Sequence, residues 1–138
     1  MSWGDAARKH AEIHDKKSES ARKAADKAHA KALAKLVAGT KDALITALGT
    51  ATSNVARREA VEAVLKEVND DINKKSPEDN PAWDMSSVAH IWGLMQEQNL
   101  LKALADALKE VETHEAARDA FSELADGLDT AETAVMPQ

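Results

Sequence analysis

Two histidines near the start of the chain have the spacing of a metal-binding pair. His10 and His14 stand four residues apart, so on a helix both imidazoles face one side and can reach one cation. A complete site needs further ligands, and the sequence contains no HExxH motif, no paired ExxH motif and no cysteine. The sequence therefore predicts no metal and no other cofactor, with His10 and His14 as the weak candidates.

Other chemistry also lacks its motifs. The chain has no G-x-S-x-G sequence and no phosphate-binding loop. Serine and threonine stand mostly where helices are expected to begin, and helix capping explains them there. The absence of cysteine rules out a thiol nucleophile and a disulfide. We therefore predict a protein without enzymatic activity.

Composition predicts an all-α fold. Aromatic residues make up only 3% of the 138-residue chain, and no stretch alternates apolar with polar residues as a β-strand does. No apolar run approaches the roughly 20 residues that span a membrane, and the N-terminus has no apolar segment typical of a signal peptide. We expect no membrane contact, and a location in the cytoplasm or in a particle assembled there.

The expected architecture is a single domain, residues 1–138, forming a bundle of four or five helices. Glycine and proline positions divide it into four segments. These are a long basic arm (1–38), a helical pair (40–75), a proline-containing loop (76–87) and acidic C-terminal helices (87–128). Gly39 is the predicted end of the first helix, and Thr113 the predicted cap of a last helix that ends near Gly127.

The first helix is predicted to be rich in alanine and amphipathic. Its inner stripe carries small residues, mainly alanine, which allow a close approach to a neighbouring helix. A helix of about 34 residues is about 50 Å long, so it must project from the body, kink, or lie along a neighbour. The opposite face carries the predicted basic interface residues Lys9, Lys16, Lys23, Lys27 and Lys31.

The stretch after the prolines gathers the largest side chains. Val88, Ile91, Trp92 and Met95 share one helical face, and the leucines from Leu101 onward lie almost opposite. Either a helix breaks at 96–99, or one long helix is buried on different faces along its length. We predict that this stretch pins the bundle or an interface between subunits, through Trp83, Ile91, Trp92 and Met95.

The corner from Leu48 to Glu59 resembles the turn and recognition-helix start of helix-turn-helix DNA-binding proteins. An apolar residue and Gly49 end one helix, and polar residues open the next. The resemblance covers about 20 residues and implies a nucleic-acid surface made by Ser53, Asn54, Arg57 and Arg58. The competing interpretation is an ordinary glycine-containing corner between two bundle helices.

Charge is distributed unevenly along the chain. Residues 1–41 hold ten Lys and Arg against five Asp and Glu, whereas the other 97 residues hold eight against 19. This pattern favours a structural or assembly protein, for example a component of a bacterial or phage particle. Such a protein would form homo-oligomers by helix packing and by attraction between the basic arm of one copy and the acidic body of another. The alternatives are a DNA-binding regulator or packaging factor that uses the corner at 44–59, and an acidic helical inhibitor of a protein partner.

Overall fold

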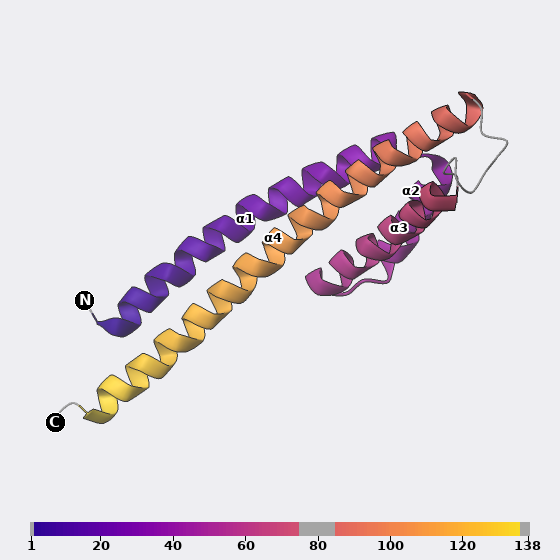
Figure 1. Ribbon diagram of the computed structural model, residues 1–138. Coiled ribbons are helices and arrows are strands. Elements are labelled where there is room, and N and C mark those ends of the chain that lie inside the picture. Colours follow the sequence, from indigo (N-terminus) through magenta and orange to yellow (C-terminus); the bar gives the residue numbers. More distant parts are fainter. Residues whose placement is uncertain (1, 75–84, 136–138) are drawn as a thin grey trace.

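The computed structural model describes residues 2–74 and 85–135, and this part of the chain folds into four helices without a strand. They are α1 (Trp3–Lys35), α2 (Ala38–Gly49), α3 (Asn54–Lys74) and α4 (Met85–Val135) (Figure 1). The prediction of an all-α fold is confirmed, with four helices. Trp83 and residues 76–84 of the predicted loop lie outside the described residues.

Helix α1 begins and ends at identifiable backbone features. The Ser2 hydroxyl accepts a hydrogen bond from the Asp5 N–H at 3.0 Å and caps the first turn. At the other end the backbone of Leu36 is extended, with φ −69° and ψ 145°. The chain therefore turns at Leu36 and Val37, not at the predicted Gly39, which lies in the first turn of α2. Leu36 is buried at this corner, and its burial fixes where the chain turns.

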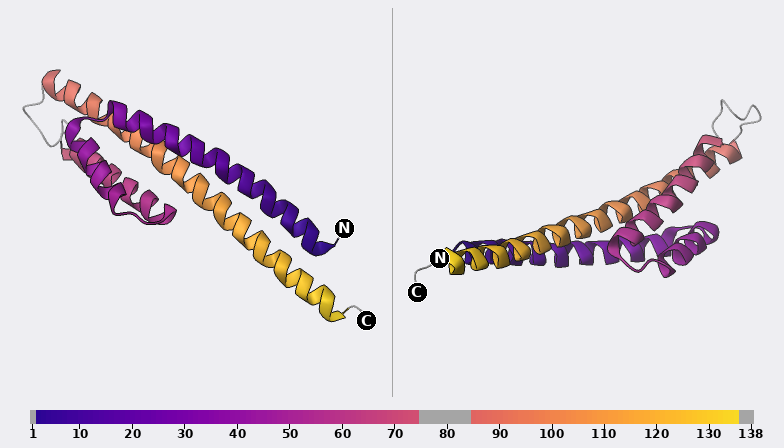
Figure 2. Two further views of the ribbon diagram at one scale, coloured as in Figure 1. Left: turned by 180° about the vertical axis from the view of Figure 1, so that it is seen from behind. Right: turned by 90° about the horizontal axis from the view of Figure 1, so that it is seen from below.

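Helices α1 and α4 form a long antiparallel pair, so α1 lies along a neighbour and does not project alone (Figures 1 and 2). The predicted small-residue stripe is the buried face of α1. Five of its buried residues recur at intervals of seven, the repeat of helices that coil around each other, at Gly4, Ala11, Ser18, Ala25 and Ala32. At Gly4 even a methyl group would collide with Asp129 of α4. Small side chains thus set how closely the two helices approach.

The α2–α3 hairpin covers only the first half of α4, on one side of the α1–α4 pair (Figure 2). The core shared by α2, α3 and α4 contains the buried residues Leu44, Val61, Val64, Val68, Leu101, Leu104 and Leu108, and we call this part of the molecule the head. Beyond this head, residues 3–20 of α1 and 115–135 of α4 continue as a two-helix stalk. The molecule is therefore a compact head with a narrow stalk.

Helix α4 is one continuous helix of 51 residues, so of the two interpretations of residues 96–99 the structure shows the long helix and not the break. The prediction that Thr113 caps a last helix is wrong, because the Thr113 hydroxyl donates to the Lys109 carbonyl within α4. Gly127 likewise lies inside α4. The shift in apolar phase that suggested a break has another cause: α4 packs against both α1 and α3 in the head, but against α1 in the stalk.

Candidate protein-binding surface

A groove runs along the α1–α4 pair on the side away from α2 and α3. Its larger hollow has a volume of about 670 Å³ and lies between the C-terminal half of α1 and the start of α4. The α1 residues that line it are Ala24, Lys27, Ala28, Lys31 and Lys35, followed by Val37 at the corner. The α4 residues are Gly93, Gln96, Glu97, Asn99, Leu100 and Ala103.

A second hollow of about 480 Å³ continues the groove toward the stalk. Ala24 lines both hollows, so they lie next to each other along the α1–α4 pair. The smaller hollow is lined by Lys16, Lys17, Ser20, Ala21, Ala24, Ala107, Glu110 and His114. The stripe that lets the two helices approach closely also leaves this outer side shallow, because alanine does not fill the space above the seam. The result is an alanine-floored channel with a lysine rim.

The predicted basic residues of α1 divide into two sets. Lys16, Lys27 and Lys31 line the groove, whereas Lys9 and Lys23 are exposed on the same helix without lining it. Within residues 2–74 and 85–135 none of these five lysines forms an ion pair.

Arginines, not lysines, attach α1 to α4. Arg8 pairs with Asp129, and Arg22 pairs with Glu115 at 2.7 Å. In the opposite direction, Arg118 of α4 reaches Asp15 at 3.2 Å. The attraction between a basic arm and an acidic body therefore acts, in part, within one chain. The lysine amines remain at the surface.

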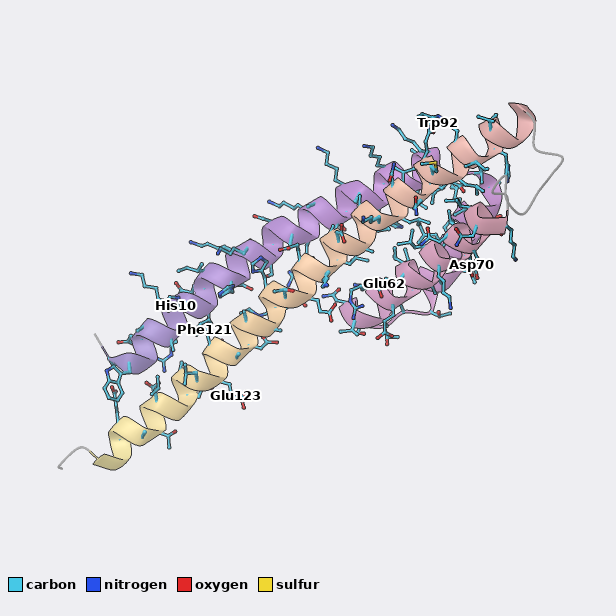
Figure 3. All side chains as sticks on the ribbon, viewed as in Figure 1. His10, Glu62, Asp70, Trp92, Phe121 and Glu123 are labelled. Atoms are coloured by element: carbon cyan, nitrogen blue, oxygen red, sulfur yellow. The ribbon has the colours of Figure 1, made fainter. Side chains whose placement is uncertain are left out.

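The predicted pin of the bundle is on the surface of this chain. Trp92 is 64% exposed and Met95 is 45% exposed, while Ile91 is half-buried (Figure 3). Of the two predicted alternatives, this exposure speaks against a pin in the core of this chain, where Leu101 and Leu104 are buried instead. Trp92 lies one helical turn before Gln96, on the side of α4 that faces the groove. Its role at a subunit interface stays a prediction.

The two candidate metal ligands lie in the stalk and contact α4, as seen for His10 beside Phe121 in Figure 3. His10 stacks on Phe121 with ring centroids 5.1 Å apart, and His14 stacks on the same ring at 5.6 Å. The Nδ1 atoms of His14 and His114 are 3.2 Å apart, a hydrogen bond in which one imidazole donates and the other accepts. Among the described residues no group of three or more His, Asp or Glu is placed to hold a metal ion.

Electrostatics disfavour a proton on His14. Partial burial lowers the pKa of His14 below its ordinary 6.5, and the charges of Lys17, His114 and His10 lower it further. An imidazolium carries a proton on both ring nitrogens and cannot accept, so the hydrogen bond between His14 and His114 needs at least one neutral ring.

The corner that resembles a helix-turn-helix uses most of its polar groups within the chain. The Ser53 hydroxyl accepts from the Ala56 N–H at 3.0 Å, and the Asn54 amide donates to Glu115 at 2.7 Å. Arg57 donates to the Asn54 side-chain oxygen at 3.1 Å. These bonds cap α3 and attach it to α4. A nucleic-acid phosphate would have to compete with them.

Arg58, the fourth predicted nucleic-acid contact, is the most firmly engaged. Its guanidinium donates to Glu112 at 2.6 Å and to Glu62 at 3.0 Å. The hydrogen bond to Glu112 raises the pKa of Arg58 most, and the same bond lowers the pKa of Glu112. Two carboxylates thus surround a charge that the DNA hypothesis needs free.

Glu97 is a structural residue that the sequence analysis missed. It is only 3% exposed, and its carboxylate accepts from the Val37 N–H at 3.0 Å and from the Thr40 hydroxyl at 3.2 Å. A carboxylate beside the first turn of α2 also suits the helix dipole. The signal was present in the sequence, since Glu97 interrupts the apolar spacing of Leu94, Leu101 and Leu104. Glu97 holds the α1–α2 corner against α4.

Comparisons of the chain with protein-family models, with curated proteins and with solved structures find no match. Helices long and apolar enough to cross a bilayer are absent from the described ranges, 2–74 and 85–135. The groove along α1 and α4 is the candidate binding surface of this chain.

Proposed function

We propose that this protein is a non-enzymatic assembly component that self-associates through the outer side of its α1–α4 pair. One observation carries the proposal: the groove with a lysine rim beside the exposed Trp92. A large aromatic side chain next to unpaired basic groups is the composition that protein interfaces favour, because it combines apolar burial with electrostatic selection.

Neighbouring exposed apolar groups extend this surface. Val37 is 60% exposed and lines the larger hollow, and Met95 lies on the turn of α4 next to Trp92. Single exposed apolar residues are common on monomers, but a group of them beside a groove marks an interaction site. A second copy that buries this group would add apolar contacts. The core of one chain has few such contacts, because many of its buried residues are alanines.

The DNA-binding alternative has weaker support. Arg58 and Asn54 are held by carboxylates of α3 and α4. The lysines of α1 line a different hollow from the one lined by Leu48, Asn54 and Arg57 of the corner. The inhibitor alternative has no distinguishing contact of its own.

Light scattering after size-exclusion chromatography tests the proposal. At tens of micromolar and low salt we expect a mass above the 14.8 kDa of one chain. The double variant Trp92→Ser/Met95→Ser should shift that mass toward one chain. Ile45→Ser/Val55→Ser is the matched control, because these residues are 48% and 42% exposed on α2 and α3. A wild-type chain that remains monomeric under these conditions refutes the proposed function.

A further inference from the structure

We infer that the groove binds the acidic outer face of the α4 stalk of a second copy, so that copies associate head to tail. The inference rests on the proposed self-association and specifies its two surfaces. One surface is the lysine-rimmed channel in the head. The other lies on the C-terminal part of α4.

The acidic face of the stalk has the chemistry to complement the groove. Asp119, Glu123 and Asp126 follow one another at helical spacing along one edge of α4, and all three are exposed. Asp119 already pairs with Arg118 at 2.9 Å, whereas among the described residues Glu123 and Asp126 form no ion pair. Glu123 points away from α1 in Figure 3. Next to this edge lies an exposed strip of small and apolar residues, formed by Ala116, Ala120, Leu124 and Gly127. Leu124 is 49% exposed, so the strip has no cover within the chain.

Size and charge both match between the two surfaces. The strip is narrow, because alanine and glycine surround a single leucine, and the groove floor is made of alanine. Small residues on both sides allow two helices to approach closely. Lys27 and Lys31 then lie beside the acidic edge of the incoming helix, one helical turn apart, as Glu123 and Asp126 are. Charge complementarity fixes which edge of the strip meets which rim.

The acidic face cannot fill the groove of its own chain. Within one chain, Asp129 of α4 pairs with Arg8, so the end of α4 is held beside the start of α1. The groove begins near Lys16 and extends the other way, toward Val37. The occupant is therefore another copy. Two different surfaces meet, and such an interface builds rings or open chains of copies.

Complementary charge reversals test this arrangement. Lys27→Glu/Lys31→Glu reverses the groove rim, and Glu123→Lys/Asp126→Lys reverses the stalk edge. We expect each variant alone to associate at least about tenfold more weakly than the wild type at low salt. An equimolar mixture of the two should regain association, since every contact then joins opposite charges. Sedimentation velocity measures all three samples.

A matched control separates this site from overall charge. Lys102→Glu/Lys109→Glu changes net charge by the same amount at two exposed positions of α4 that do not line the groove. This variant should associate like the wild type, and circular dichroism should show helical unfolding curves for every variant. A monomeric wild type refutes self-association itself. A wild type that associates, with both reversals unaffected or with a mixture that stays dissociated, overturns only the groove-to-stalk contact.

Discussion

Replacement of Ala32 by leucine tests whether small side chains set the α1–α4 distance. Ala32 has 0% exposure and belongs to the core cluster of the head, so a larger side chain has no free space to enter. Extra methylenes in a packed core cost about 1–3 kcal/mol, because neighbours must leave their preferred rotamers. Leucine is nearly as good a helix former as alanine, so helix propensity adds little to this cost. We therefore expect Ala32→Leu to lose about 1–3 kcal/mol of unfolding free energy.

Ala30→Leu is the matched control for that measurement. Ala30 is exposed on the same helix two residues away, and the same substitution there should change stability by less than about 0.5 kcal/mol. Urea unfolding followed by circular dichroism at 222 nm compares them, and a slope of about 1–3 kcal/mol per molar predicts a midpoint lower by about 1 M for Ala32→Leu. Equal midpoints for the two variants would refute the close packing of α1 on α4.

Three further predictions concern other contacts. Trp92→Ala should change the unfolding free energy by less than about 1 kcal/mol, as measured by urea titration of the monomer, because the side chain is 64% exposed. Because the pKa of His14 is lowered in the folded chain, the unfolded chain binds a proton at His14 at a higher pH than the folded chain does, so the unfolding free energy should fall as pH drops below about 6.5. Thermal unfolding measured at several pH values should show a smaller decrease of Tm in acid for His14→Gln than for the wild type. Arg58→Ala should lower Tm at pH 7, and the difference from wild type should shrink in acid as the lowered pKa of Glu112 is passed and that carboxylate is protonated. A constant difference between pH 7 and acid would contradict the Arg58 assignment.

Helix content and the inner face of α1 were predictable from local pattern. The spacing of Ala11, Ser18, Ala25 and Ala32 identifies a buried stripe without knowledge of its partner, since helical period alone places these residues together. The turn between α2 and α3 was likewise marked by Gly49 and by the capping residue Ser53.

The continuity of α4 could not be derived in the same way. The change in phase between Met95 and Leu101 has two explanations, and only the position of α3 decides between them. The place of Trp92, in the bundle or between subunits, was left open for a related reason. A large apolar residue at helical spacing indicates a buried face, but not whether this chain or another chain buries it.

The surface groups also depended on tertiary structure. The sequence could list Lys27, Arg22 and Arg58 as basic, but not that the arginines would pair across helices while the lysine would stay free. The His14–His114 contact joins residues 100 positions apart, and no local spacing points to it. Long-range pairing of this kind follows from the antiparallel register of α1 and α4.

That register has a mechanical consequence. Both described ends lie at the tip of the stalk, where the Trp3 N–H donates to Glu132 of α4 (Figure 1). A load that pulls the two ends apart would act across the α1–α4 seam, not along it, and would break the contacts one turn at a time from the tip. The contact of Trp3 with Glu132 would break first, Arg8 with Asp129 next, and the histidine pair would follow. The head would keep its core until the stalk had opened, so the stalk would act as the weak, extensible part of the molecule under tension.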